Sequence, residues 1–171
     1  MATTFSEETS KEIREFVQLT SRMARQSGRS FGVIPSVAYV AEFGRVYTTG
    51  TKPKGKLRQR GLCFRNAAQL AISNPSEYTY VEGYAYTVCI PMEHAWCVNR
   101  AGVVVDPTWG LEGKAYFGVP IRLDTLVAAL DATQYYGVFG WATWRKVYPI
   151  LAKENAKKSE KIDCVEQTTL V

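Results

Sequence analysis

The chain has 171 residues, 46% hydrophobic and 12% aromatic, which is typical of one globular domain rather than a disordered protein. Twenty-one Lys and Arg residues against sixteen Asp and Glu give a net charge of +5, too low for a dedicated nucleic-acid-binding protein. Neither a membrane-spanning apolar run nor a secretory signal is present, so we expect a cytoplasmic protein with reduced cysteines and no membrane partner.

The first part of the chain predicts one long helix followed by short strands. Residues 9–26 carry apolar side chains at helical spacing, with Thr9 and Glu12 as a capping box and Gly28 as the stop. From 30 to 49, aromatic and β-branched residues are interrupted by Gly and Pro. This pattern predicts one or two short strands or irregular segments.

A basic stretch comes next, in which every second residue from 52 to 60 is cationic and no acidic residue intervenes. As a mobile loop it would be an ordinary solvated run of charge. As an extended segment it would place five positive charges along one edge of the chain. The sequence leaves both possibilities open.

The segment 63–73 predicts a helix by its Ala, Gln and Leu content, ended by Asn74-Pro75. Cys63 then lies in the first turn, where free backbone N–H groups and the helix dipole favour a thiolate. The alternative is a buried cysteine that packs and does not react.

Three strands are predicted after this helix, at 78–90, 94–99 and 102–107, and they form an antiparallel meander against which the helix can pack. Gly83 marks a bulge or a close backbone approach in the first strand. The last two strands form a hairpin with a Gly-containing turn at 99–102.

His94 is the only histidine of the chain, and the hairpin brings it to Asp106. A ladder centred on Arg100 pairs these two positions on one face of the sheet, about 5 Å apart at Cβ. A carboxylate there would fix the tautomer of the imidazole and stabilise its charged form.

The rest of the chain predicts a strand at 116–121, a helix at 124–131, an aromatic segment at 135–148 that packs over the sheet, and a polar tail. We expect one domain over residues 1–155, with an N-terminal helix within 1–28. Residues 156–171 are expected to be a flexible polar tail that contains Cys164.

Cys63, His94 and Asp106 together supply the parts of an activated thiol: a nucleophile, a base and a group that orients the base. Gln59, four residues before the cysteine, is a candidate donor for an oxyanion hole, because a side-chain amide donates without a change of charge.

The segments Gly-Leu-Cys63-Phe-Arg-Asn-Ala, His94-Ala-Trp96 and Val-Val-Asp106-Pro-Thr108-Trp resemble the core of the papain-like cysteine hydrolases, most closely the transglutaminase-like branch. The resemblance covers residues 58–109. It implies an α+β fold in which the cysteine-bearing helix packs on an antiparallel sheet. The sequence around Cys63 also resembles the Arg-Gly-Gly-x-Cys-Phe motif of arylamine N-acetyltransferases, although one glycine of that motif is missing.

The resemblance implies acyl transfer from a peptide, isopeptide or side-chain amide through a Cys63 thioester, without a metal or other cofactor. Hydrolysis and acyl transfer share this intermediate and differ only in what attacks it. Trp96, Arg58 and Arg60 are candidate substrate contacts, and the basic stretch hints at an acidic protein or peptide substrate.

Two other interpretations stay open. Cys89, His94 and Cys97 lie within nine residues, but their spacing matches no common zinc site, and residues 94 and 97 of one strand face opposite sides. A non-enzymatic binding module could use the 52–60 stretch to contact an acidic protein or nucleic acid, which would leave His94 opposite Asp106 as a coincidence.

Overall fold

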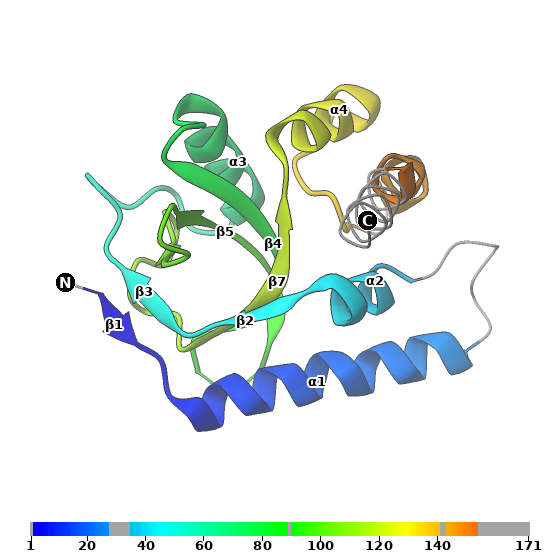
Figure 1. Ribbon diagram of the computed structural model, residues 1–171, viewed down its shortest axis with the longest axis horizontal. Helices are drawn as coiled ribbons and strands as arrows, with labels where there is room; N and C mark the ends of the chain where they lie inside the picture. Colours follow the sequence, from blue (N-terminus) through cyan, green and yellow to red (C-terminus); the bar gives the residue numbers. More distant parts are fainter. Residues whose placement is uncertain (1, 28–34, 89, 141–142, 154–171) are drawn as a thin grey trace, which may run out of the picture.

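The computed structural model describes residues 2–27, 35–88, 90–140 and 143–153. Its fold is α+β, as predicted: helices pack on a mixed sheet that has seven strands in the described part of the chain (Figure 1). The elements in chain order are β1 (Thr3–Thr4), α1 (Glu7–Gln26), α2 (Ser36–Phe43), β2 (Arg45–Tyr47), β3 (Thr49–Thr51), α3 (Cys63–Ser73), β4 (Tyr78–Tyr86), β5 (Met92–Asn99), β6 (Val104–Val105), β7 (Ala115–Ile121) and α4 (Leu123–Thr133). Residues 144–153 are also helical.

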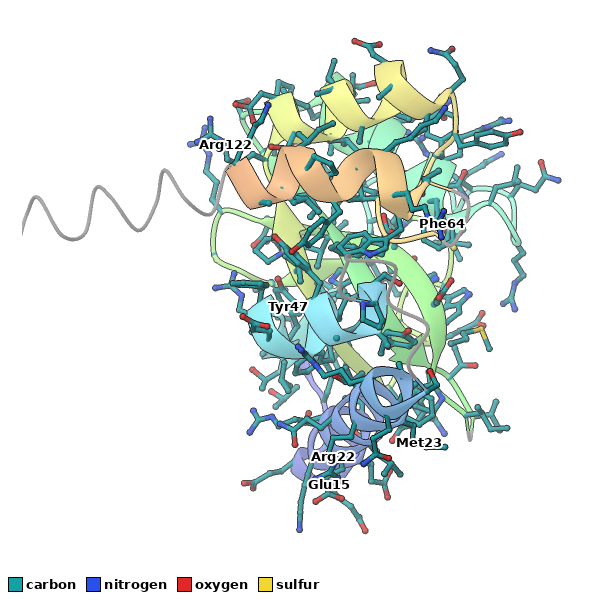
Figure 2. The ribbon with its side chains drawn as sticks, turned by 90° about the vertical axis from the view of Figure 1, so that its right-hand side faces the viewer. Glu15, Arg22, Met23, Tyr47, Phe64 and Arg122 are labelled. Atoms are coloured by element: carbon teal, nitrogen blue, oxygen red, sulfur yellow. The ribbon has the colours of Figure 1, made fainter. Side chains whose placement is uncertain are left out.

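The strands lie in the order β1-β3-β6-β5-β4-β7-β2, and all neighbours are antiparallel except β3 and β6. Helices α4, 144–153, α2 and α1 follow one another down one side of the molecule (Figure 2). The main core lies between the helices and the sheet, and a smaller aromatic cluster lies on the other face. β6 is short and pairs only with Cys97 and Val98 of β5. The candidate site forms beside the earlier part of β5, beyond the end of β6.

α3 begins at Cys63 and ends at Ser73, as the sequence predicted. Its small residues Ala67, Ala68 and Ala71 are buried against the sheet. The Cys97 thiol of β5 donates to the Ala67 carbonyl at 3.3 Å. The predicted packing of the cysteine-bearing helix on the meander is therefore confirmed.

α1 differs from the prediction at its start. It begins at Glu7, two residues earlier than expected, and Ser6 occupies the N-cap without a side-chain cap. The capping box of Thr9 and Glu12 does not form, because the Thr9 hydroxyl donates to the carbonyls of Ser6 and Lys114. A contact with a distant loop thus replaces the local one.

The strands predicted between 30 and 49 are correct only in their last part, where β2 and β3 form. Residues 36–43 form a helix instead, in which Val37 and Val40 are buried against the sheet. Strand propensity is a weak preference that tertiary packing overrides. Gly28, the predicted stop of the first helix, lies outside the described residues.

The β5–β6 turn is the one predicted. The Gly102 N–H donates to the Asn99 carbonyl at 2.9 Å. The Asn99 side chain accepts from the N–H groups of Ala101 and Val103 at 3.0 and 3.1 Å. This side chain satisfies turn amides that no strand partner reaches, which is the usual role of Asn in a turn.

The predicted register of the hairpin is wrong by two residues. Val98 pairs with Val104, so the ladder is centred on Ala101 rather than on Arg100. Extended by this register, Asp106 would lie level with Trp96. A shift of two keeps every side chain on its face, because strand side chains alternate with a period of two.

β4 ends at Tyr86, before the predicted end at residue 90, and Cys89 lies outside the described residues. Gly83 confirms the predicted close approach: a Cβ there would overlap the Phe117 carbonyl and the Gly118 Cα of β7. β7 and α4 occupy the predicted places and extend slightly beyond them.

The aromatic segment 135–148 packs over the sheet as expected, in the part that the structure describes. Its buried apolar members are Val138, Phe139, Trp144 and Val147. Tyr135 is 67% exposed. The predicted tail at 156–171 lies outside the described residues.

Candidate functional site

Three elements bring the predicted triad together. Cys63 opens α3, His94 lies near the start of β5, and Asp106 directly follows β6. His94 is 1% exposed and Asp106 is fully buried, whereas Cys63 is half-buried. The imidazole and the carboxylate are therefore shielded from water, and the sulfur remains within reach of a solute.

Asp106 holds His94 in one orientation. The His94 Nε2 and Asp106 Oδ2 atoms are 2.7 Å apart, and the Tyr116 hydroxyl donates to the same oxygen at 3.0 Å. The other oxygen, Oδ1, accepts from the N–H groups of Thr108 and Trp109 at 2.8 and 2.9 Å. Four partners thus fix the carboxylate, which in turn fixes the tautomer of the imidazole.

The His94 ring also interacts with Cys63. Burial lowers the pKa of His94, but hydrogen bonds and charge interactions with Asp106 and Cys63 outweigh it and raise the pKa to about 9. Asp106 uses Nε2, which leaves Nδ1 as the ring nitrogen not bound to the carboxylate. The Cys63 side chain is thus part of the electrostatic environment of the imidazole.

Aromatic rings enclose the imidazole. The Trp109 ring stacks on His94, with ring centroids 3.7 Å apart and an angle of 10° between the planes. Trp96 lies on the same side of β5, with its ring centroid 6.2 Å from that of His94. It is fully buried and packs over Gly118, so the structure places this predicted substrate contact in the core, behind the imidazole.

The N-terminus of α3 has no side-chain cap. Leu62 stands at the N-cap, and the first turn contains no acidic residue. The first turn of α1, in contrast, carries Glu7 and Glu8. The positive end of the α3 dipole is therefore available to a negative charge at or near Cys63.

The other predicted site residues lie on the loop that leads to Cys63. The Gln59 side chain is exposed, and the Gln59 carbonyl accepts from Asn66 Nδ2 at 2.8 Å. Arg58 is half-buried, and its guanidinium donates to the Asn66 carbonyl and to the Gln69 side chain, both at 3.2 Å. Arg60 pairs with Glu112. Both arginines are thus engaged within the chain.

Glu82 is a buried acidic residue that the sequence analysis missed. Its carboxylate accepts from the Tyr80 hydroxyl at 2.6 Å and from the N–H groups of Val138 and Phe139 at 2.7 Å. Burial raises the pKa of Glu82 to about 7, although these hydrogen bonds act in the opposite direction. An acidic residue inside an aromatic strand is the signal that could have pointed to it.

The structure gives the zinc interpretation no support in the described residues. His94 and Cys97 lie on opposite faces of β5, and Cys97 packs against α3. Within the part of the chain that the structure describes, no group of three or more His, Cys, Asp or Glu side chains could hold a metal ion. Cys89 lies outside that part.

Comparisons with protein-family models, with curated proteins and with solved structures found no match to this chain. Among the described residues, no helix is both long and apolar enough to cross a membrane.

Proposed function

We propose that this chain is a thiol-dependent hydrolase or acyltransferase that acts on an amide bond of a protein, peptide or side chain through a Cys63 thioester. The observation that carries the proposal is the buried His94 imidazole, whose Nε2 lies 2.7 Å from Asp106 Oδ2 and whose pKa both Asp106 and Cys63 raise. This arrangement equips a histidine to hold the thiol proton and to pass it to a leaving group.

The chemistry proceeds in two halves. The Cys63 sulfur attacks the amide carbon, an S–C bond forms, and the carbonyl electron pair moves to oxygen. We assign the stabilisation of this oxyanion to the N–H groups at the start of α3, with Gln59 as a second candidate donor. When the C–N bond breaks, the proton on His94 Nδ1 goes to the leaving amine and a thioester remains.

The second half releases the acyl group. Water or an amine attacks the thioester, and His94 takes the proton of the attacking group. The C–S bond then breaks and Cys63 is regenerated as the thiolate beside the imidazolium. The choice between water and an amine separates a hydrolase from an acyltransferase.

The fold is consistent with the proposed resemblance to the papain-like enzymes, transglutaminase-like branch. A cysteine at the start of a helix, a histidine on one strand and an aspartate after the next occur in the expected order. The helix packs on the antiparallel part of the sheet.

The basic stretch gives less support to a binding module. Lys54 pairs with Glu77 at 2.6 Å, Arg60 pairs with Glu112, and Arg58 is turned inward. Three of the five cationic side chains therefore form intramolecular contacts. Lys52 and Lys56 are exposed and would be the natural contacts for an acidic segment of a substrate.

Alkylation of Cys63 tests the proposal without a known substrate. Iodoacetamide at neutral pH is expected to label Cys63 much faster than buried Cys97, whose pKa burial raises. The His94→Ala variant should lose most of this rate, and peptide mass spectrometry after timed quenching measures both sites. Labelling of Cys63 no faster than a free cysteine, or unchanged in His94→Ala, would refute the thiol mechanism.

Incubation with model peptide amides and activated esters then identifies the acyl donor. A thioester on Cys63 should appear in intact-mass spectra, disappear with hydroxylamine and be absent from Cys63→Ser. Addition of a primary amine distinguishes the two outcomes, because a transferase gives an amide product and a hydrolase gives the acid.

A further inference from the structure

Asn66 is a buried polar residue one helical turn after Cys63. It is 3% exposed. Its amide nitrogen donates to the Gln59 carbonyl at 2.8 Å and to the Thr108 hydroxyl at 3.1 Å. Both hydrogens of one side-chain amide are thereby used, and each reaches a different loop. The amide joins α3 to the loop before Cys63 and to the loop after Asp106.

Both loops belong to the site. The Thr108 N–H donates to Asp106 Oδ1 at 2.8 Å, so Thr108 touches the carboxylate and Asn66 at once. Gln59 lies on the loop that leads into Cys63. A backbone hydrogen bond also joins the two loops, from the Arg58 N–H to the Pro107 carbonyl at 2.8 Å.

We infer that Asn66 is a positioning residue, which fixes the Asp106 loop relative to the Cys63 sulfur. The inference rests on the proposed function of Cys63. His94 is held by Asp106 on one side and must meet Cys63 on the other, so the helix and the loop have to keep a constant separation. A displacement of about 1 Å in such an arrangement can cost about a hundredfold in rate.

The competing explanation is that Asn66 only satisfies buried polar groups of the fold. Its loss would then lower stability, since a buried carbonyl left without a hydrogen-bond donor is costly. The reactivity of the folded protein would be unchanged. The two explanations therefore differ in the reaction rate of Cys63 measured at a temperature where every variant is folded.

The test compares Asn66→Ala and Thr108→Val with a control at the C-cap of the same helix, Asn74→Ala. The Asn74 amide donates to the Leu70 carbonyl at the far end of α3, at 3.2 Å. The readout is the second-order rate of Cys63 alkylation by iodoacetamide from pH 5 to 10. Thermal unfolding followed by circular dichroism sets the working temperature.

Asn66→Ala is expected to lower the alkylation rate at pH 7 by about tenfold and to move its pH profile toward that of an ordinary thiol. Thr108→Val, which removes one of the two acceptors, should lower the rate less. Asn74→Ala should leave rate and profile unchanged even if it lowers the melting temperature. The double variant of Asn66 and Thr108 should react no more slowly than Asn66→Ala alone, because the shared bond is already lost.

Rates within twofold of the parent in both Asn66→Ala and Thr108→Val would overturn the inference. If Asn66→Ala does not fold, Thr108→Val decides alone, since valine matches threonine in shape. A parent protein with fast, His94-dependent labelling but unaffected variants refutes only the role of Asn66. Slow labelling of Cys63 in the parent refutes the proposed function and this inference with it.

Discussion

Trp109 lies flat against His94, with the two ring centroids 3.7 Å apart. The N–H of the same tryptophan donates to Asp106 Oδ1, so its backbone orients the carboxylate while its ring covers the imidazole. One residue therefore contacts both members of the His94–Asp106 pair. A substitution at Trp109 removes the contact of the ring and keeps the backbone N–H, so the effect of the ring can be measured alone.

Replacement of Trp109 by alanine is expected to slow alkylation of Cys63 by about three- to tenfold. The lost stacking is worth about 0.5–1.5 kcal/mol, and the imidazole becomes more mobile and more exposed to water. Trp109→Phe keeps an aromatic face and should retain most of the rate. Tyr135→Ala, at an exposed ring, serves as the control. Equal rates in all three variants would show that the stack has no role in reactivity.

The titration of His94 is expected to have an apparent pKa near 9, well above its usual 6.5. The chain has one histidine, so the imidazole signals in NMR spectra need no assignment. Asp106→Asn removes the charge that raises the value, and the pKa of His94 should then fall, because burial alone lowers it. Cys63→Ser should lower it less. A parent pKa near 6.5 would contradict the proposed contacts of the ring.

The same shift makes a prediction for stability. The folded protein binds the His94 proton more tightly than the unfolded chain does. The contribution of His94 to the free energy of unfolding is therefore fully present below about pH 6.5 and is lost as the pH rises to about 9. Urea unfolding across this range should show a decline that is smaller in Asp106→Asn. A decline of the same size in that variant would assign it to other groups.

Glu82 should also make the free energy of unfolding depend on pH, over a lower pH range than His94 does. Its pKa of about 7 in the folded protein lies above the ordinary 4.5, so its contribution declines as the pH rises from about 4.5 to about 7. Glu82→Gln should remove this decline. It should also cost about 1–3 kcal/mol, because an amide NH₂ would face the N–H of Val138 or Phe139. Urea unfolding of both proteins at pH 4.5 and 7.5 measures the two effects. An unchanged slope in Glu82→Gln would locate the titrating group elsewhere.

Alanine at Gly83 is expected to lower the free energy of unfolding by about 3 kcal/mol, since the added Cβ meets the backbone of β7. A backbone neighbour cannot turn aside as a flexible side chain can. Thr79→Ala, at an exposed position of the same strand, should change stability far less. Chemical denaturation of the two variants gives the comparison. Equal stabilities would mean that β4 and β7 separate easily at this point.

The sequence was sufficient where local signals determine the structure. The helix at Cys63 has good helix formers and a Pro-terminated end, and the turn at Asn99 has its own side-chain hydrogen bonds. The pairing of His94 with Asp106 was also predictable, although through an incorrect register. Asp106 reaches the imidazole just beyond the end of β6, where no ladder constrains it.

Features that depend on distant contacts were not predictable in this way. The α2 helix forms because Val37 and Val40 find a buried surface, which no local pattern reveals. Asn66 and Glu82 each acquire at least one partner from a segment more than 40 residues away. The local sequence around an amide or a carboxylate does not predict which distant loop will supply its hydrogen-bond partner.

The start of α3 has no side-chain cap, and a cap that stabilises the protein would be expected to lower the reactivity of Cys63. Leu62→Asp would supply the missing cap and is expected to stabilise the protein by about 1 kcal/mol. The new carboxylate would accept from the N–H groups in the first turn of α3, and under the proposed function it would repel a thiolate at Cys63. Laboratory evolution for heat resistance alone should therefore favour an acidic residue at this position, whereas selection that also demands turnover should reject it.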